Sequence, residues 1–131
     1  MMAPQSIRIV QILAAAVAVL FGVATLFAGG RVLLGSDPGY EVFRPLLHYN
    51  TAMGLAYLVA GVIMWRSVDA GRYAAGAIFL LNLLVLAAVV IAYRRGGAVA
   101  VDSLQAMTFR TVVWLVLFLA LGWLIRLRTA A

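Results

Sequence analysis

The stretch IVQILAAAVAVLFGVATLFAG, residues 9–29, decides the fold, because it contains no Asp, Glu, Lys or Arg. Residues 45–65 and 73–93 form two more stretches of this kind, and each of the three is 21 residues long. A helix of that length rises about 31 Å, which matches the hydrocarbon core of a bilayer. A fourth, shorter stretch covers residues 111–125. The sequence therefore predicts an all-α integral membrane protein, a bundle of four transmembrane helices.

The composition supports this class. Hydrophobic residues make up 66% of the 131-residue chain and charged residues 11%, a balance that would leave a soluble domain with too much exposed apolar surface. Four spans and their connections use almost all of the sequence. We therefore expect a single transmembrane domain, with spans near residues 9–29, 45–65, 73–93 and 103–125.

The reactive side chains are few. The chain has no Cys, a single histidine (His48) and four scattered acidic residues, which argues against disulfides, thiolate chemistry, bis-His haem ligation and carboxylate metal clusters. All ten basic residues are Arg, and most lie at the ends of spans rather than on a folded basic domain. We therefore expect no metal, no resident cofactor other than a bound lipid or quinone, and no nucleic-acid partner.

The distribution of arginine predicts the topology. With four spans, both termini share one side with the connection between the second and third spans. That side carries five arginines and the other side five, or three if Arg44 and Arg110 lie within the membrane boundary. The second count favours cytoplasmic termini. We expect insertion in a bacterial inner membrane in this orientation.

The first and third connections resemble each other. GGRVLLGSDPGYEVFRPLLHY, from residue 29, aligns with GGAVAVDSLQAMTFRTVVWL, from residue 96, after a one-residue gap. The alignment pairs Phe43 with Phe109, Arg44 with Arg110 and His48 with Trp114. It suggests two duplicated helical hairpins inserted the same way up. Coincidence in a composition rich in Gly and Val is the alternative.

Small and polar residues within the spans predict how the helices pack. Small side chains form a stripe along the first span and an approximate stripe along the second. Such stripes let the helix backbones approach closely. Asn82 and Asn50 are expected to hydrogen-bond to neighbouring helices. Tyrosines and tryptophans at span ends are expected to be interface anchors. The stripe on the first span comprises Ala14, Ala18 and Gly22, and that on the second Asn50, Gly54 and Gly61. The aromatic residues at span ends are Tyr40, Tyr49, Tyr93, Trp65 and Trp123.

Arg110 is the leading candidate for a functional residue. Residues 111–125 would span only about 22 Å, so the fourth helix must begin earlier. Asp102 is a candidate N-cap with Gln105 three residues later, and this predicts a start near residue 103. Arg110 then lies about two turns inside the helix, where an arginine costs at least ~2.5 kcal/mol and usually faces the bundle. The alternative is that its side chain extends to the interface.

Other polar residues fall at a similar depth. His48 lies 18 residues before Arg66, and Arg110 lies 16 before Arg126. Pro45 suits a first helical position, which leaves Arg44 at the helix mouth. The predicted ligand site comprises Arg44, His48, Thr51, Arg110 and Trp114, with Thr25 of the first span at the same level.

These features favour a non-catalytic subunit or accessory component of a membrane complex. Its outer-leaflet Arg/His pocket would hold the headgroup of a lipid or quinone, and its partners would be membrane lipids and other membrane subunits or further copies of the chain. The alternative is a small homodimeric transporter or channel for an anion, with Arg110 as its substrate site. An enzyme with His48 as acid/base is disfavoured, because no second titratable partner is evident.

Overall fold

The computed structural model describes residues 3–130, and within that range the chain is all-helical with no strand. Each of the four helices is long and apolar enough to cross a membrane. They are α1 (Pro4–Leu33), α2 (Arg44–Arg66), α3 (Val68–Arg94) and α4 (Val101–Ala130). The predicted four-helix bundle of membrane-spanning length is thus confirmed as an architecture.

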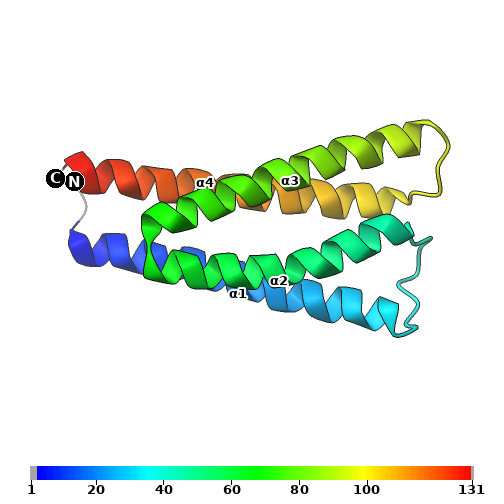
Figure 1. Ribbon diagram of the computed structural model, residues 1–131, viewed down its shortest axis with the longest axis horizontal. Coiled ribbons are helices and arrows are strands. Elements are labelled where there is room, and N and C mark those ends of the chain that lie inside the picture. Colours follow the sequence, from blue (N-terminus) through cyan, green and yellow to red (C-terminus); the bar gives the residue numbers. More distant parts are fainter. Residues whose placement is uncertain (1–2, 131) are drawn as a thin grey trace.

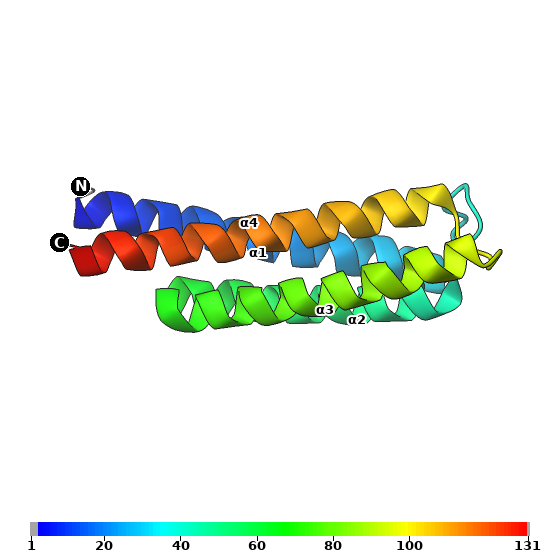
Figure 2. The ribbon, with the colours of Figure 1, turned by 90° about the horizontal axis from the view of Figure 1, so that it is seen from above.

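The helices alternate in direction (Figure 1). The start of α1, the end of α4 and the α2–α3 junction lie toward one end of the bundle, called here the terminal end, and the α1–α2 and α3–α4 loops lie at the other, the loop end. Seen from above, α1 and α4 form one layer and α2 and α3 the other (Figure 2). Contacts are most extensive within the pairs α1–α2 and α3–α4, fewer between α2 and α3, and fewer again between α1 and α4. The bundle is therefore two antiparallel hairpins side by side.

The α1–α2 hairpin packs through the predicted small residues. Ala14, Ala18 and Gly22 are all buried. A Cβ atom at Gly22 would lie 2.8 Å from the carbonyl oxygen of Gly54, and one at Gly61 would meet α1 in the same way. Such an approach is possible only without a side chain, and it brings the backbones of α1 and α2 into close contact. The packing role predicted for these residues is confirmed.

The terminal end is fastened by polar contacts. The side-chain amide of Gln11 is buried on α1 and donates to the carbonyl oxygens of Met64 and Trp65 at 2.8 and 3.1 Å. Arg8 also donates to the Trp65 carbonyl, at 2.7 Å. These contacts satisfy carbonyls in the last turn of α2, which have no partner within their own helix. A single residue, Ser67, then separates α2 from α3, and its hydroxyl accepts from an N–H in the first turn of α3 at 3.1 Å.

Asn82 links the two hairpins near the middle of the bundle. It is fully buried on α3, and its Oδ1 accepts from the hydroxyl of Tyr49 on α2 at 2.8 Å. Its amide also donates to the hydroxyl of Tyr57 at 3.2 Å. The predicted hydrogen bond from Asn82 to another helix is confirmed. The interpretation of Tyr49 as an interface anchor was wrong, because its hydroxyl turns inward to Asn82.

The start of α4 also differs from the prediction. Helix α4 begins at Val101, and the N–H groups of Ser103 and Leu104 both donate to the Ala100 carbonyl. Asp102 therefore lies inside the first turn rather than at the N-cap, where its charge still suits the positive end of the helix dipole. Arg110 consequently lies about two and a half turns into α4.

Candidate binding site

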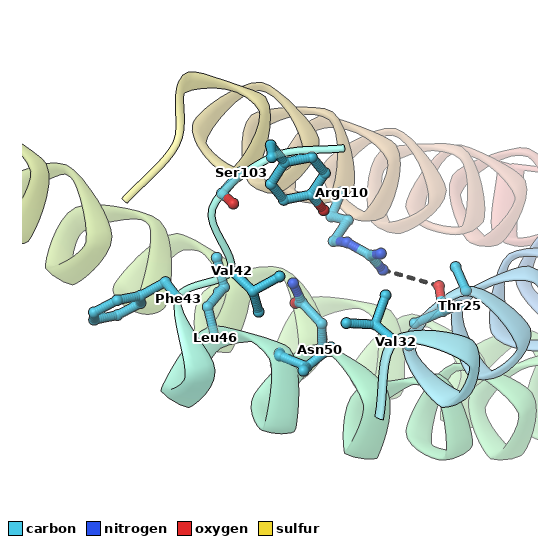
Figure 3. Close-up of a pocket in the computed structure, with 12 residues that line it drawn as sticks. Thr25, Val32, Val42, Phe43, Leu46, Asn50, Ser103 and Arg110 are labelled. Carbon is cyan, nitrogen blue, oxygen red and sulfur yellow. Dashed lines mark hydrogen bonds between the residues drawn. The ribbon is translucent and has the colours of Figure 1, made fainter. Parts of the chain in front are cut away.

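A cavity of about 100 Å³ lies at the loop end, between the two hairpins. Helix α1 supplies one wall, α2 a second and α4 a third, and the α1–α2 loop completes the enclosure (Figure 3). Its polar side chains come from all of these segments. They are Thr25 of α1, Tyr40 of the loop, Asn50 of α2, and Ser103 and Arg110 of α4.

Arg110 is the only charged residue that lines this cavity within residues 3–130. Its Nη1 donates to the hydroxyl of Thr25 at 2.8 Å, as Figure 3 shows, and its guanidinium lies 5.5 Å from the ring centre of Phe21. The predicted proximity of Thr25 and Arg110 is confirmed. The Nε atom of Arg110 is buried and has no hydrogen-bond partner within residues 3–130. Arg110 therefore keeps hydrogen-bonding capacity that the described protein does not use.

No carboxylate of the described residues forms an ion pair with Arg110. All four acidic residues are exposed, and the one ion pair found in the described part of the chain joins Asp69 to Arg128 at 2.9 Å. A guanidinium stays charged at any physiological pH. Its contacts inside the bundle are a hydroxyl and an aromatic ring, both weaker partners than an anion. The site therefore holds an uncompensated positive charge.

Asn50 adds a second unsatisfied group. Its Oδ1 atom is buried and accepts no hydrogen bond from the described residues, so the predicted bond from Asn50 to a neighbouring helix is not formed by this atom. Buried polar atoms are nearly always hydrogen-bonded, and each exception requires an explanation. In Figure 3 Asn50 and Arg110 approach the same space from opposite sides. The cavity thus offers a donor at Arg110 and an acceptor at Asn50.

The α1–α2 loop closes the cavity because its turn is fixed by local chemistry. The Asp37 carboxylate accepts the N–H of Gly39 at 2.8 Å, and Gly39 has φ 86°, a conformation that favours glycine. This turn places Tyr40, Val42 and Phe43 in the cavity wall. Tyr40, interpreted from the sequence as an interface anchor, thus contributes to the site. The sequence DPGY carried a turn signal that could have predicted this placement.

The five predicted site residues separate into three groups. Arg110 lines the cavity. Trp114 and Thr51 do not line the cavity. Trp114 is fully buried, with its ring centre 4.8 Å from that of Tyr57. The Thr51 hydroxyl donates to the Leu47 carbonyl of its own helix. Arg44 and His48 are exposed and do not line the cavity.

Helix geometry explains the position of His48. Successive residues of a helix are rotated by about 100°, so residues two positions apart point to nearly opposite sides. Leu46 and Asn50 line the cavity, and His48 lies two residues from each of them. It therefore points away, and within the described chain it makes no hydrogen bond to Arg110.

Comparison with known proteins adds no constraint on function, because no protein-family description, curated protein or solved structure gives a significant match. Within residues 3–130 no group of three His, Cys, Asp or Glu side chains is placed to hold a metal ion. Among the described residues that line the cavity there is no His, Asp or Glu. What the site can do chemically is hold a group that combines a hydrogen-bond acceptor, preferably charged, with a donor.

Proposed function

We propose that this chain is a non-catalytic membrane protein, acting as a subunit or accessory component of a membrane complex, which binds the headgroup of a lipid or quinone at Arg110. The observation that carries the proposal is that Arg110 and Asn50 both line a cavity of about 100 Å³, and that each also has a buried polar atom, Nε and Oδ1, with no hydrogen-bond partner within residues 3–130. Buried polar atoms are nearly always hydrogen-bonded, so these two side chains retain capacity to bind a polar group.

The size of the cavity limits what enters it. Pockets for whole drug-sized molecules measure about 300–1,000 Å³, so about 100 Å³ accepts only a single functional group. The rest of the ligand must lie outside, as the chains of a membrane amphiphile would. A phosphate or carbonyl oxygen would accept from Arg110, and a neighbouring hydroxyl would donate to Asn50. A phosphoglycerol headgroup or a quinol offers both.

Arg110→Leu is expected to reduce the amount of copurifying lipid or quinone by roughly 10-fold or more, because hydrogen bonds to charged groups contribute about 1.5–3 kcal/mol. Leucine is favourable in a membrane span, so insertion should be unaffected. The measurement is mass spectrometry of small molecules extracted from protein purified in mild detergent. Arg94→Leu, at the same end of the bundle but outside the cavity, is the control.

Equal ligand content in the two variants would contradict the proposal and favour a side chain that merely extends to the interface. The energetic coupling of His48 to Arg110 stays a prediction. A double-mutant cycle with His48→Ala measures it, since residues of one network couple by about 0.5–3 kcal/mol and separate sites add within about 0.3–0.5 kcal/mol. Additivity would restrict the site to the cavity residues.

Anion transport is the second candidate, favoured by the uncompensated charge of Arg110. Below the cavity, however, the centre of the bundle is filled by fully buried side chains of α2 and α4, including Tyr57, Trp114 and Leu121. A path for an anion would therefore have to run between copies of the chain. Substrate-dependent anion flux in liposomes that contain only this protein would favour transport over headgroup binding.

The proposal includes an orientation: termini in the cytoplasm of a bacterium and the Arg110 cavity in the outer leaflet of the inner membrane. The support is the distribution of arginine, five at the terminal end against three at the loop end when Arg44 and Arg110 are counted within the membrane boundary. In this Cys-free chain we expect Ala98→Cys, in the exposed α3–α4 loop, to react with an impermeant maleimide in intact cells. Gln5→Cys should react only after permeabilisation. The opposite labelling pattern would reverse the orientation.

A further inference from the structure

A second polar groove lies between α3 and α4, on the side of the bundle toward the terminal end. It measures about 400 Å³, and its walls combine two arginines, Arg72 of α3 and Arg126 of α4, with apolar side chains that include Phe118 and Trp123. It lies within one hairpin and shares no lining residue with the Arg110 cavity.

The two arginines of this groove are available for a ligand. Neither forms an ion pair or a side-chain hydrogen bond within residues 3–130. The nearby carboxylate of Asp69 is occupied, because Arg128 donates to both of its oxygens at 3.0 and 2.9 Å. The groove therefore carries two positive charges and no negative one.

The shape of the groove is set by two contacts. The Arg72 guanidinium lies 5.3 Å from the ring centre of Phe118, which holds the half-buried side chain against α4. Gly122 faces Arg72 from α4, and a Cβ atom there would be 3.5 Å from Arg72 Nε. A glycine at this position leaves open the space beside the guanidinium, and a larger side chain would fill it.

We infer that the Arg72–Arg126 groove binds the phosphodiester headgroup of an anionic phospholipid. Two guanidinium groups at the end of apolar helices match a phosphate at the membrane surface, and the apolar walls that include Leu119 and Ile125 suit the adjoining acyl chains. A headgroup of net negative charge is preferred because the groove contains no carboxylate to balance a choline or an amine. This inference does not depend on a ligand at Arg110.

The test is native mass spectrometry of the purified chain titrated with phosphatidylglycerol, with phosphatidylcholine as the comparison lipid. Arg72→Gln/Arg126→Gln should weaken phosphatidylglycerol binding by roughly 25-fold, from the usual contribution of two basic residues at a membrane surface. Arg66→Gln/Arg94→Gln removes the same charge outside the groove and should change binding less than twofold. Gly122→Leu keeps both charges and should weaken binding by roughly fivefold or more, whereas Gly122→Ala should not.

Three results would overturn the inference. Equal losses of phosphatidylglycerol binding in the two double variants would mean that binding depends on overall charge rather than on the groove. Equal affinity for phosphatidylcholine would remove the preference for an anionic lipid. Displacement of phosphatidylglycerol by an equimolar amount of inorganic phosphate would make the site one for a free anion. Thermal unfolding of each variant is measured alongside, and if Gly122→Leu does not fold, the comparison of the two double variants decides the outcome.

Discussion

Trp114→Ala is expected to lower the free energy of unfolding by about 3 kcal/mol, the lower end of the range for truncating a large buried aromatic residue. Trp114 is fully buried on α4, its ring stacks on Tyr57 with centroids 4.8 Å apart, and Phe21 of α1 meets it edge-on. One side chain thus joins three helices. The lower end applies because helices that separate in detergent remain shielded from water, so the loss is mainly one of packing.

Trp123→Ala is the matched control. The two tryptophans lie on the same helix, but Trp123 is 50% exposed, so its truncation should change the free energy of unfolding by less than about 0.5 kcal/mol. Denaturant titration of both variants in mild detergent measures the difference. A similar loss of unfolding free energy in the two variants would mean that the Trp114–Tyr57 stack does not stabilise the centre of the bundle.

Gly22→Leu is expected to have an effect of similar size, a destabilisation of about 3 kcal/mol. A Cβ atom at Gly22 would lie 2.8 Å from both the Gly54 carbonyl oxygen and the Leu58 backbone nitrogen. Backbone cannot rotate aside as a flexible side chain can, so α1 and α2 must separate. The unfolding temperature in mild detergent should fall accordingly.

Gly30→Leu serves as the control for this substitution, since a Cβ atom at Gly30 on the same helix meets nothing within 4 Å. It should leave the unfolding temperature nearly unchanged. If Gly22→Leu has the same unfolding temperature as Gly30→Leu and the unsubstituted protein, α1 and α2 do not approach as closely as the structure indicates.

The sequence predicts most of the architecture because its long uncharged runs are compatible with few structures. Backbone groups in hydrocarbon must be paired internally, so an uncharged run of 21 residues, which is long enough to cross a bilayer, favours a helix. The stripe of Ala14, Ala18 and Gly22 and the buried Asn82 were predictable for the same reason. The first residue of α4 was less predictable, because Asp102 suits a first turn as well as an N-cap.

The candidate site was predicted only in part. Arg110 stands out because a charge next to an apolar run requires an explanation, and counting residues along each helix places Thr25 at its level. Counting residues gives the depth of a side chain along the helix axis but not the direction in which it points around that axis. His48 was therefore grouped with Arg110 although the two side chains point in different directions. The contribution of Asn50 depends on which face α2 turns to α4, and tertiary packing alone decides that.

The single-residue connection at Ser67 keeps the terminal ends of α2 and α3 together. With α2 fastened to α1 by Gln11, any tilt of one hairpin against the other would displace this end little, and the Tyr49–Asn82 and Thr25–Arg110 hydrogen bonds oppose such a tilt. At the far end, about 35 Å away, a tilt of only 5° displaces the loops by about 3 Å. The cavity at Arg110 lies between the hairpins at that far end, so its width responds to such a tilt. The Arg72–Arg126 groove lies within one hairpin and keeps its dimensions.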